Sequence, residues 1–178
     1  PGLALSYAKR ATELDGESFG AWANLGFIYS RTERYSEAIE AFRSASELAG
    51  SEDDLSPVLI GLADAHIRMG NYSRATNTLN TLIGSKPSST AHERLGVCLF
   101  KQRKYEDALR EFKKAVELDG QDTAALNGLG VAYMTLYIEG GRDNTFQRDQ
   151  ALKAWSKSLD LKPNQSSIVS LVTRYSDI

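Results

Sequence analysis

One short pattern of aromatic and small residues limits the fold of this chain more than any other feature of its sequence. The pattern has two groups with helical spacing, and its first clear copy consists of Trp22, Leu25, Gly26, Tyr29, Ala38, Phe42 and Ala45. Residues three or four positions apart lie on one face of an α-helix. The segment therefore predicts two consecutive helices, over residues 19–32 and 35–49, that pack against each other through these faces.

Each position has a physical role in such a helix pair. Leu25 and Tyr29 fill the space between the two helices, whereas Gly26 has no side chain and lets a neighbouring backbone approach closely. Ala38 is small where the second helix presses on the first, and Phe42, one turn later, fills the seam. We expect the stability of such a chain to come from the interfaces between neighbouring helix pairs.

Further copies of the pattern follow along the chain, with different residues at several positions. Their first-helix positions are occupied by Leu59, Leu62, Ala63 and His66, then by His92, Leu95, Gly96 and Leu99, and finally by Leu126, Leu129, Gly130 and Tyr133. Upstream of the first copy lies a predicted second helix, whose inner face consists of Ala4, Ala8, Ala11 and Leu14. Ala11 and Ala45 are 34 residues apart, which is a typical period for repeated helix pairs.

With this signature and this period the chain resembles the tetratricopeptide repeat family, and the resemblance covers almost the whole sequence. It implies an all-α fold, a right-handed α-solenoid of antiparallel helix pairs. We expect a single domain over residues 1–178, divided into a half repeat at 1–17, complete repeats at 18–51, 56–88, 89–121 and 122–164, and a C-terminal capping helix at 165–178. Because the chain starts at Pro1 and inside a repeat, we interpret it as a fragment of a larger protein.

Two segments depart from the regular period. Residues 51–57 are polar and are expected to form a linker, with Ser56 capping the next helix and Pro57 at its first position. The last repeat has extra residues between its two helices, and two adjacent glycines place them in a loop near residues 137–147. Such a loop is either a contact for a partner domain or a neutral insertion, and both interpretations stay open.

The composition argues against several classes of protein. The net charge is −2, so the chain has no broad positive field that would hold nucleic acid. No apolar run approaches the roughly 18 residues of a membrane span, and no membrane partner is expected. Cys98 is the only cysteine, which rules out an internal disulfide and favours a cytoplasmic location without establishing one.

No arrangement of residues points to catalysis, a metal or a cofactor. His66 and His92, the only two histidines, fall at core positions of the repeat and lack the spacing of a metal-binding pair. Cys98 falls at a small buried position, where a structural role is expected. The segment Gly128-Leu129-Gly130 lacks the third glycine of a phosphate-binding loop and lies inside a predicted helix. We therefore expect a protein that is not an enzyme, with no catalytic residues, no metal ligands and no cofactor.

The resemblance implies that one face of the first helices lines a concave groove that binds a peptide. The corresponding positions are Phe27, Arg31, Ile60, Asp64, Ile67, Arg68, Glu93, Val97, Phe100, Lys101, Asn127, Val131 and Met134. Much of this row is apolar, and a row of exposed apolar residues usually marks a contact surface. The alternative is that the superhelix curls enough to bury these side chains against one another.

Three cations occupy the same position in successive first helices, namely Arg31, Arg68 and Lys101. As a ladder of positive charge they would suit a peptide with acidic residues or a free C-terminus, and as a solvated basic face they would have no ligand. The family also contains a carboxylate clamp that grips the C-termini of chaperones. Ala23 and Thr90 stand where that clamp needs other residues, so binding of chaperone C-termini is disfavoured.

These observations lead to a non-catalytic scaffold that docks a peptide or helix of another protein in its concave groove. The alternative is an architectural or oligomerisation module of a larger multidomain enzyme or assembly, in which case a homodimer is possible. Contact with RNA through the helical-repeat surface is a third and weaker hypothesis, because the net charge of −2 opposes it.

Overall fold

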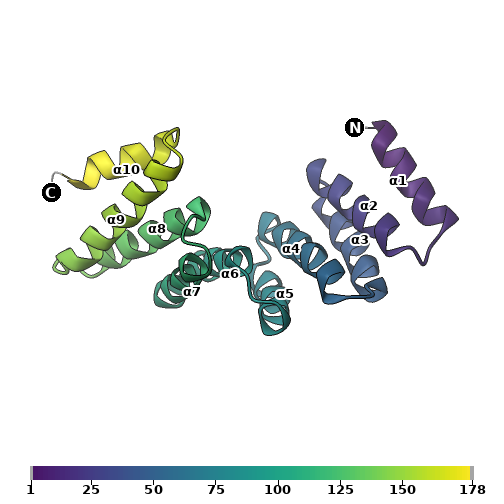
Figure 1. Cartoon of the computed structure of the whole chain (residues 1–178), viewed down its shortest axis with the longest axis horizontal. Helices are drawn as coiled ribbons and strands as arrows, with labels where there is room; N and C mark the ends of the chain where they lie inside the picture. The colour runs from purple at the N-terminus through teal and green to yellow at the C-terminus, as the bar shows by residue number, and fades with distance from the viewer. Residues whose placement is uncertain (1, 177–178) are drawn as a thin grey trace. The chain divides into compact units, whose positions relative to one another are not determined.

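The structure is a computed structural model that describes residues 2–176, and every regular element within those residues is a helix. The helices follow one another with short connections (Figure 1). Their bounds are α1 Gly2–Leu14, α2 Phe19–Arg31, α3 Tyr35–Leu48, α4 Glu52–Arg68, α5 Tyr72–Ser85, α6 Ser89–Lys101, α7 Tyr105–Leu118, α8 Thr123–Glu139, α9 Thr145–Leu161 and α10 Ser166–Ser176. The predicted all-α class is confirmed.

The helices group into two compact units, residues 1–87 with α1 to α5 and residues 88–178 with α6 to α10. In the N-terminal unit α2 pairs with α3 and α4 with α5, while α1 packs on α2 and α3 packs on α4. In the C-terminal unit α6 pairs with α7 and α8 with α9, and α10 packs on α9. The expectation of a single domain over the whole chain stays a prediction.

Each first helix of a complete repeat starts behind a polar residue that caps it. Ser18, Ser51, Ser88 and Asp122 accept hydrogen bonds from backbone N–H groups in the first turns of α2, α4, α6 and α8. A side-chain oxygen in this position satisfies a backbone donor that has no partner inside the helix. These caps determine where the helices that carry the candidate site begin.

The cap on α4 overturns the linker predicted before that helix. Ser51 accepts a hydrogen bond from the backbone N–H of Asp54 at 3.1 Å, so α4 already begins at Glu52, where acidic side chains suit the positive helix end. Ser56 does not cap the helix, because its hydroxyl donates to the Glu52 carbonyl at 2.8 Å. The prediction treated Pro57 as a helix start, whereas the proline lies inside α4.

A single phenylalanine holds three helices of the N-terminal unit together. Phe42 on α3 is completely buried between Gly26 of α2 and Gly61 of α4. A Cβ atom added to either glycine would lie 2.6 Å from a carbon of the Phe42 ring, closer than real Cβ atoms approach. The small residues therefore make the space that the ring fills; the prediction for Gly26 is close approach of a backbone, whereas the group that approaches it is the Phe42 side chain.

The C-terminal unit repeats this arrangement and extends it. Phe112 on α7 is buried against Gly96 of α6 and Gly128 of α8, and a Cβ atom at Gly96 would lie 2.7 Å from its ring. Trp155 on α9 is buried against Gly130 in the same way. The glycines that look like part of a phosphate-binding loop in the sequence are therefore packing positions inside α8.

The connection between α8 and α9 is shorter than the loop predicted near 137–147. It comprises residues 140–144, because α8 continues to Glu139 and α9 begins at Thr145. The extra residues lengthen the helices, so α8 and α9 have 17 residues each, whereas α2 has 13 and α3 has 14. Tyr137, which the sequence assigns to the loop, is a buried residue of α8.

The two terminal helices differ in how much of their apolar surface is covered. In α10, Ile168 is buried, and a partly buried group packs with it on the cluster around Trp155 of α9. In α1, only Ala8 of the predicted inner face is buried, and Leu14 is 73% exposed. Ala4 and Ala11 are also exposed, so most of the predicted inner face of α1 is open among the described residues, although α1 packs on α2.

Candidate peptide-binding surface

The predicted site residues of the N-terminal unit lie on α2 and α4. We call them the N-terminal candidate surface, and they are Phe27, Arg31, Ile60, Asp64, Ile67 and Arg68. Phe27 is 38% exposed, the two arginines are exposed, and the other three residues are half-buried. The surface thus combines one exposed aromatic ring with two positive charges.

Phe27 is held by the core beneath it. Its ring meets that of Phe42 edge-on, with ring centres 5.0 Å apart and planes inclined by 73°. This geometry is a favourable one for aromatic pairs. Because Phe42 is itself wedged between two glycines, Phe27 presents a fixed apolar surface to solvent.

The C-terminal candidate surface lies on α6 and α8 and contains Glu93, Val97, Phe100, Lys101, Asn127, Val131 and Met134. Lys101 is exposed, and the two valines and Phe100 are half-buried. The ring of Phe100 is also tilted against that of Tyr105, with centres 5.0 Å apart. These four residues and the half-buried Asn127 leave side-chain surface open.

The remaining residues of this surface are largely occupied within the chain. Met134 is buried in the cluster that contains Trp155, and Glu93 is buried and forms an ion pair with Arg94. Asn127 donates from its amide nitrogen to the Gln165 side chain at 2.7 Å, which ties α8 to the segment before α10. The helical spacing predicts correctly on which face of the helix these residues lie. It does not predict that residues distant in the sequence pack over them.

Arg31, Arg68 and Lys101 are each the last residue of a first helix. Among the described residues, none of the three has an ion-pair partner, whereas Arg34 donates to Glu37 at 2.8 Å. A cation at the end of a helix interacts favourably with the partial negative charge there. The geometry is compatible with both interpretations given for them, a solvated basic face and attraction of an acidic ligand, and it adds stabilisation of the helix end.

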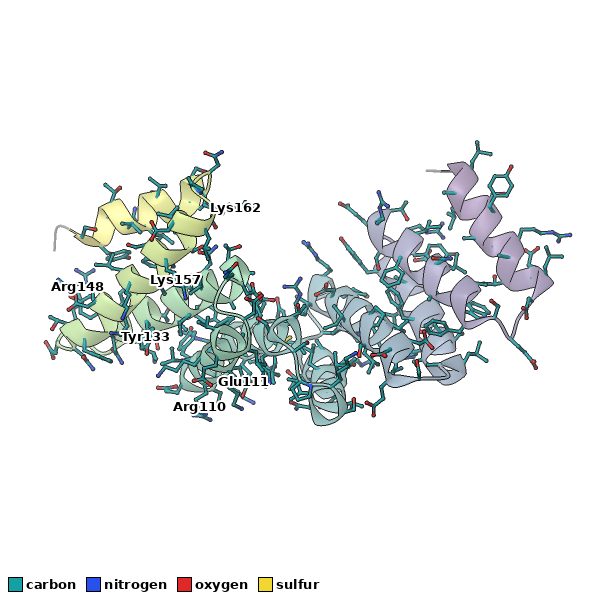
Figure 2. The ribbon with its side chains drawn as sticks, in the orientation of Figure 1. Arg110, Glu111, Tyr133, Arg148, Lys157 and Lys162 are labelled. Atoms are coloured by element: carbon teal, nitrogen blue, oxygen red, sulfur yellow. The ribbon has the colours of Figure 1, made fainter. Side chains whose placement is uncertain are left out.

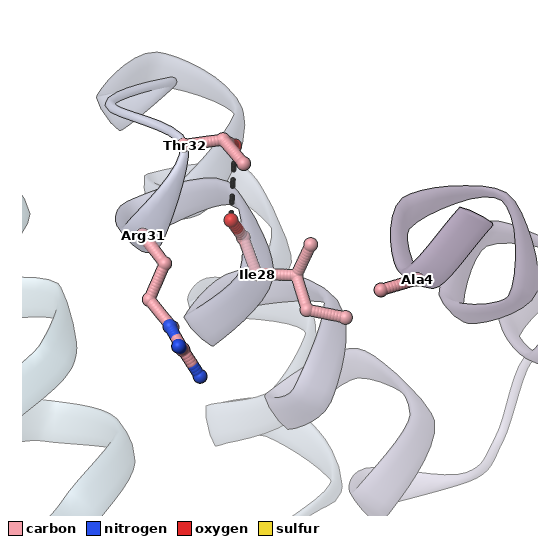
Figure 3. Close-up of a pocket in the computed structure, with 4 residues that line it drawn as sticks. All are labelled: Ala4, Ile28, Arg31 and Thr32. Atoms are coloured by element: carbon pink, nitrogen blue, oxygen red, sulfur yellow. Dashed lines mark hydrogen bonds between the residues drawn. The ribbon is translucent and has the colours of Figure 1, made fainter. Parts of the chain in front are cut away.

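A pocket opens between α1 and α2 on the N-terminal unit (Figure 3). It has a volume of about 320 Å³ and is lined by Ala4, Ile28, Arg31 and Thr32. Of these, only Arg31 belongs to the predicted site. The other residues were missed because the pocket depends on where α1 lies, although Ile28, Arg31 and Thr32 have the three- and four-residue spacing of one helix face.

Both histidines are buried, which confirms their predicted packing role, but their surroundings differ. His92 on α6 lies 2.7 Å from a carboxylate oxygen of Glu111 on α7, whose other oxygen accepts from Lys114 at 2.9 Å. Figure 2 labels Glu111 on α7. Burial alone would raise the pKa of Glu111, and the hydrogen bonds from Lys114 and His92 outweigh it, so the pKa lies below its ordinary value. This cluster is a structural link between α6 and α7.

His66 on α4 has no such carboxylate link in the described structure. It is 3% exposed, and its Nδ1 atom is buried without a hydrogen-bond partner. Burial lowers the pKa of His66, and the positive charges of Arg43 and Arg74 lower it further. Burial and the two arginines therefore favour the neutral imidazole, which is part of the packing between α4 and its neighbours.

Cys98 is completely buried, as expected for a structural residue at its position. Within residues 2–176 no group of three or more His, Cys, Asp and Glu side chains is arranged to hold a metal ion. None of the described helices combines the length and the apolar character needed to cross a bilayer.

Comparison with known sequences gives one family. Two models described as tetratricopeptide repeat match the chain, one over residues 17–84 and the other over residues 60–123 and again over residues 99–136. The matched ranges overlap and together run from residue 17 to residue 136. They include α2 to α7 and most of α8, which carry both candidate surfaces.

Three curated relatives are similar over parts of their length. The Arabidopsis thaliana Protein CTR9 homolog is 25% identical over 72% of this chain, RNA polymerase II-associated protein 3 of Mus musculus is 30% identical over 58%, and the human Protein O-mannosyl-transferase TMTC1 is 25% identical over 80%. The chain spans only 12%, 16% and 15% of these proteins, respectively.

Solved structures show the same fold. The crystal structure of YrrB, described as a TPR protein with an unusual peptide-binding site, is 21% identical, covers 94% of this chain and 80% of its own, and has a TM-score of 0.69. The first TPR of Spaghetti (RPAP3), bound to the HSP90 peptide SRMEEVD, is 20% identical, covers 68% of this chain and 90% of its own, and has a TM-score of 0.61. The predicted α-solenoid of helix pairs is confirmed.

Proposed function

The chain belongs to the tetratricopeptide repeat family, and on that premise we propose that it is a non-catalytic scaffold that binds a peptide or helix of another protein. The fold itself suggests a protein–protein interaction scaffold. Our proposal is more specific, because it assigns the binding to exposed residues of the first helices.

The observation that carries the proposal is the exposed ring of Phe27 on α2, together with two cations, Arg31 on the same helix and Arg68 on α4, that have no ion-pair partner among the described residues. Phe27 is fixed on Phe42, so its contact surface loses little conformational freedom when a ligand binds. Arg31 and Arg68 add charge that can orient an acidic ligand. In the C-terminal unit, Phe100 and Lys101 offer a similar pair on α6.

The two related structures are identical to this chain at only about one residue in five. They therefore support peptide binding through the shared fold alone. One is described as having a peptide-binding site and the other as bound to a peptide. We do not extend the proposal to chaperone C-termini, because Ala23 and Thr90 depart from the carboxylate clamp. The partner class is therefore a protein segment of another kind.

The proposal is tested by selecting peptides from a random library of 12-residue peptides on the whole 178-residue chain. A double variant with Phe27→Ser and Phe100→Ser should weaken the selected peptides at least about tenfold, because it removes the two aromatic contacts. Phe146→Ser is the matched control, since Phe146 is 62% exposed on α9 outside both candidate surfaces. Peptides that bind the double variant with the same affinity as the parent chain would refute the assignment to these surfaces.

A second candidate function rests on α1. Leu3, Tyr7 and Leu14 are 75%, 73% and 73% exposed, and their spacing places them on one side of the helix. Such an apolar stripe favours an architectural role, in which the segment joins a second copy of itself or another part of a larger assembly. The name of the TMTC1 relative describes a transferase, and the chain corresponds to only 15% of that protein.

Sedimentation equilibrium of the whole chain separates the two functions. A dimer that is lost in the variant Tyr7→Ser would favour self-assembly through α1, and a monomer at every concentration would favour docking of a partner peptide. The cytoplasmic location and the exclusion of nucleic acid and membranes stay proposals. Imaging of a fluorescent fusion and binding assays with RNA and lipid vesicles test them.

A further inference from the structure

The turn between α6 and α7 carries a group of exposed positive charges. Lys101 ends α6, Arg103 and Lys104 follow it in the turn, and all three side chains are exposed. We propose that these three cations, which we call the cationic turn, bind an acidic stretch of the partner peptide that has two or more neighbouring Asp or Glu residues. This inference rests on the proposed peptide-binding function and deepens it, because it names a sequence feature of the partner.

The backbone of this turn occurs elsewhere in the chain with other side chains. In the α2–α3, α4–α5 and α6–α7 turns, one position of left-handed backbone has φ values of 59°, 74° and 62° and is occupied by Glu33, Gly70 and Arg103. The residue after it donates from its backbone N–H at 2.9 Å to the carbonyl five residues earlier, in Arg34, Asn71 and Lys104 alike. The turn therefore forms with a negative, a neutral or a positive residue, and its geometry does not require the cations.

Lys104 is unfavourably placed for the stability of α7. It is the N-cap residue of that helix, where no side chain makes a cap hydrogen bond, and the partial positive charge of a helix N-terminus opposes a cation. Arg34, at the same place before α3, is offset by its hydrogen bond to Glu37 at 2.8 Å. Lys104 has no ion-pair partner among the described residues, because Asp107, the counterpart of Glu37, pairs with Arg110. A charge that local stability does not explain is typical of a functional position.

Arg103 is held beside the aromatic part of the C-terminal candidate surface. Its Nε atom donates to the Tyr105 hydroxyl at 3.3 Å, and the Tyr105 ring is tilted against that of Phe100, with ring centres 5.0 Å apart. Its ion pair with Glu139 of α8 spans 3.6 Å between side chains that are 79% and 46% exposed. Such an exposed pair contributes little to stability, so a ligand carboxylate can replace it. A peptide that contacts Phe100 therefore has the cationic turn within reach of its neighbouring residues.

The arrangement of the cations favours several carboxylates of a short protein segment. The three side chains start from different backbone positions, so they match negative charges that are spread over neighbouring residues better than one compact phosphate group. A long polyanion such as RNA is disfavoured, because Glu106 and Asp107 begin α7 beside the turn and the net charge of the chain is −2.

Peptides selected on the whole chain from the random library provide the probe. The expected result is enrichment of peptides with neighbouring Asp or Glu residues near an apolar one, and loss of about tenfold in affinity when the acidic residues are replaced by Asn or Gln. Raising the salt concentration from about 0.05 M to about 0.5 M should weaken the acidic peptides and leave their Asn and Gln versions nearly unchanged. A phosphoserine version that binds about tenfold more tightly would assign the turn to a phosphate group and overturn the choice of carboxylates.

The chain itself supplies a variant that removes two cations and keeps the turn. Arg103→Gly combined with Lys104→Asn gives this turn the residues that Gly70 and Asn71 provide between α4 and α5. The variant should weaken the acidic peptides about fivefold, since each exposed pair is worth about a factor of two. Its melting temperature should be unchanged or higher, because a cation is removed from the start of α7.

A matched control and a charge reversal complete the test. Lys153→Gln combined with Lys157→Gln is an equal change of charge at exposed sites on α9, and it should leave affinity unchanged. In Arg103→Glu combined with Lys104→Glu, affinity should be recovered by a peptide with Lys in place of its acidic residues. Glu33 adopts the same backbone conformation, so the turn accommodates the first of these changes. A purely local role of the cations predicts no such recovery.

The outcomes separate this inference from the proposed function. Acidic peptides that bind the Arg103→Gly, Lys104→Asn variant normally, or enriched peptides without neighbouring acidic residues, would overturn the assignment to the cationic turn. The function would remain intact if the same peptides lost affinity with Phe27→Ser and Phe100→Ser. A short oligouridylate that binds the parent chain and not the turn variant would assign the cations to nucleic acid and overturn the inference. Failure to enrich any peptide that depends on the candidate surfaces would overturn both.

Discussion

The two units of the chain share a packing device but differ in the charges buried beside it. In each unit a phenylalanine, Phe42 or Phe112, is wedged between two glycines of adjacent first helices. The N-terminal unit then buries His66 near two arginines, while the C-terminal unit buries His92 against the carboxylate of Glu111. The repeat pattern therefore specifies the size and shape of the side chain at each position. The charges around that side chain depend on the residues that neighbouring helices place there.

The largest effect should come from removing the wedge. Phe42→Ala and Phe112→Ala should each lower the free energy of unfolding by about 3–5 kcal/mol, because a large cavity replaces a fully packed ring. Chemical denaturation followed by circular dichroism measures the loss, with the exposed Phe146→Ala as control. A small loss in only one of the two variants would break the equivalence of the units.

Removal of the buried carboxylate should have an intermediate effect, confined to the C-terminal unit. Glu111→Ala leaves the Nδ1 atom of His92 without its partner and should cost about 1–3 kcal/mol. Glu106→Ala, on the same helix but exposed, is the control and should change stability little. An equal loss in both variants would mean that the His92–Glu111 contact contributes nothing beyond helix propensity.

A smaller effect should appear as the pH is lowered, and it should begin in the N-terminal unit. Because folding lowers the pKa of His66, the unfolded chain binds its proton more readily, and acid favours unfolding. The stabilisation is complete above the ordinary pKa of about 6.5 and is lost as the pH falls from there toward the lower folded value. Glu111 follows the same rule below about pH 4.5, since its folded pKa is also lowered.

Amide hydrogen exchange at about pH 7.5 and about pH 5.5, corrected for its intrinsic pH dependence, measures this difference helix by helix. Protection of α4 should fall in the parent chain and should change less in His66→Leu, which cannot titrate. If α4 keeps its protection at the lower pH, His66 is not the group that makes the N-terminal unit sensitive to acid.

The smallest effect should come from one of the cations near His66. Arg74→Gln removes the weakest of the three influences that lower the pKa of His66, so the loss of α4 protection should still begin near the ordinary pKa but should level off at a slightly higher pH and be smaller. Nuclear magnetic resonance titration of the imidazole follows the pKa directly. An unchanged pKa would show that burial and Arg43 account for the shift without Arg74.

Much of the fold could be predicted because it is encoded in local spacing. The positions of Gly26, Phe42 and their later counterparts follow from helical periodicity, and Phe42 fills the seam as expected, although it is its ring and not a backbone that lies against Gly26. The start of α4 differs from the predicted one near Pro57, because Ser51 caps the helix earlier and the proline is accommodated inside it. The loop near 137–147 was placed too broadly, since extra residues can extend helices as well as form loops.

The candidate site was less predictable. The spacing assigns Phe27, Phe100 and Met134 to similar helix faces, but Met134 is buried by α9 and α10, which follow it by many residues. Ala4 and Ile28 gave no sign of a pocket, because the pocket exists only where α1 and α2 diverge. The exposure of a side chain and the shape of a pocket depend on contacts between residues far apart in the sequence. A pattern of local spacing carries no information about those contacts.

By itself, the amino-acid sequence determined that this chain forms stacked helix pairs, because side-chain size at every third or fourth position is a local property of a helix. Only the tertiary structure decided which faces stay open, which carboxylate meets His92, and which cations lack an ion-pair partner within residues 2–176. Those features arise from contacts between separate helices, and such contacts exist only once the chain has folded.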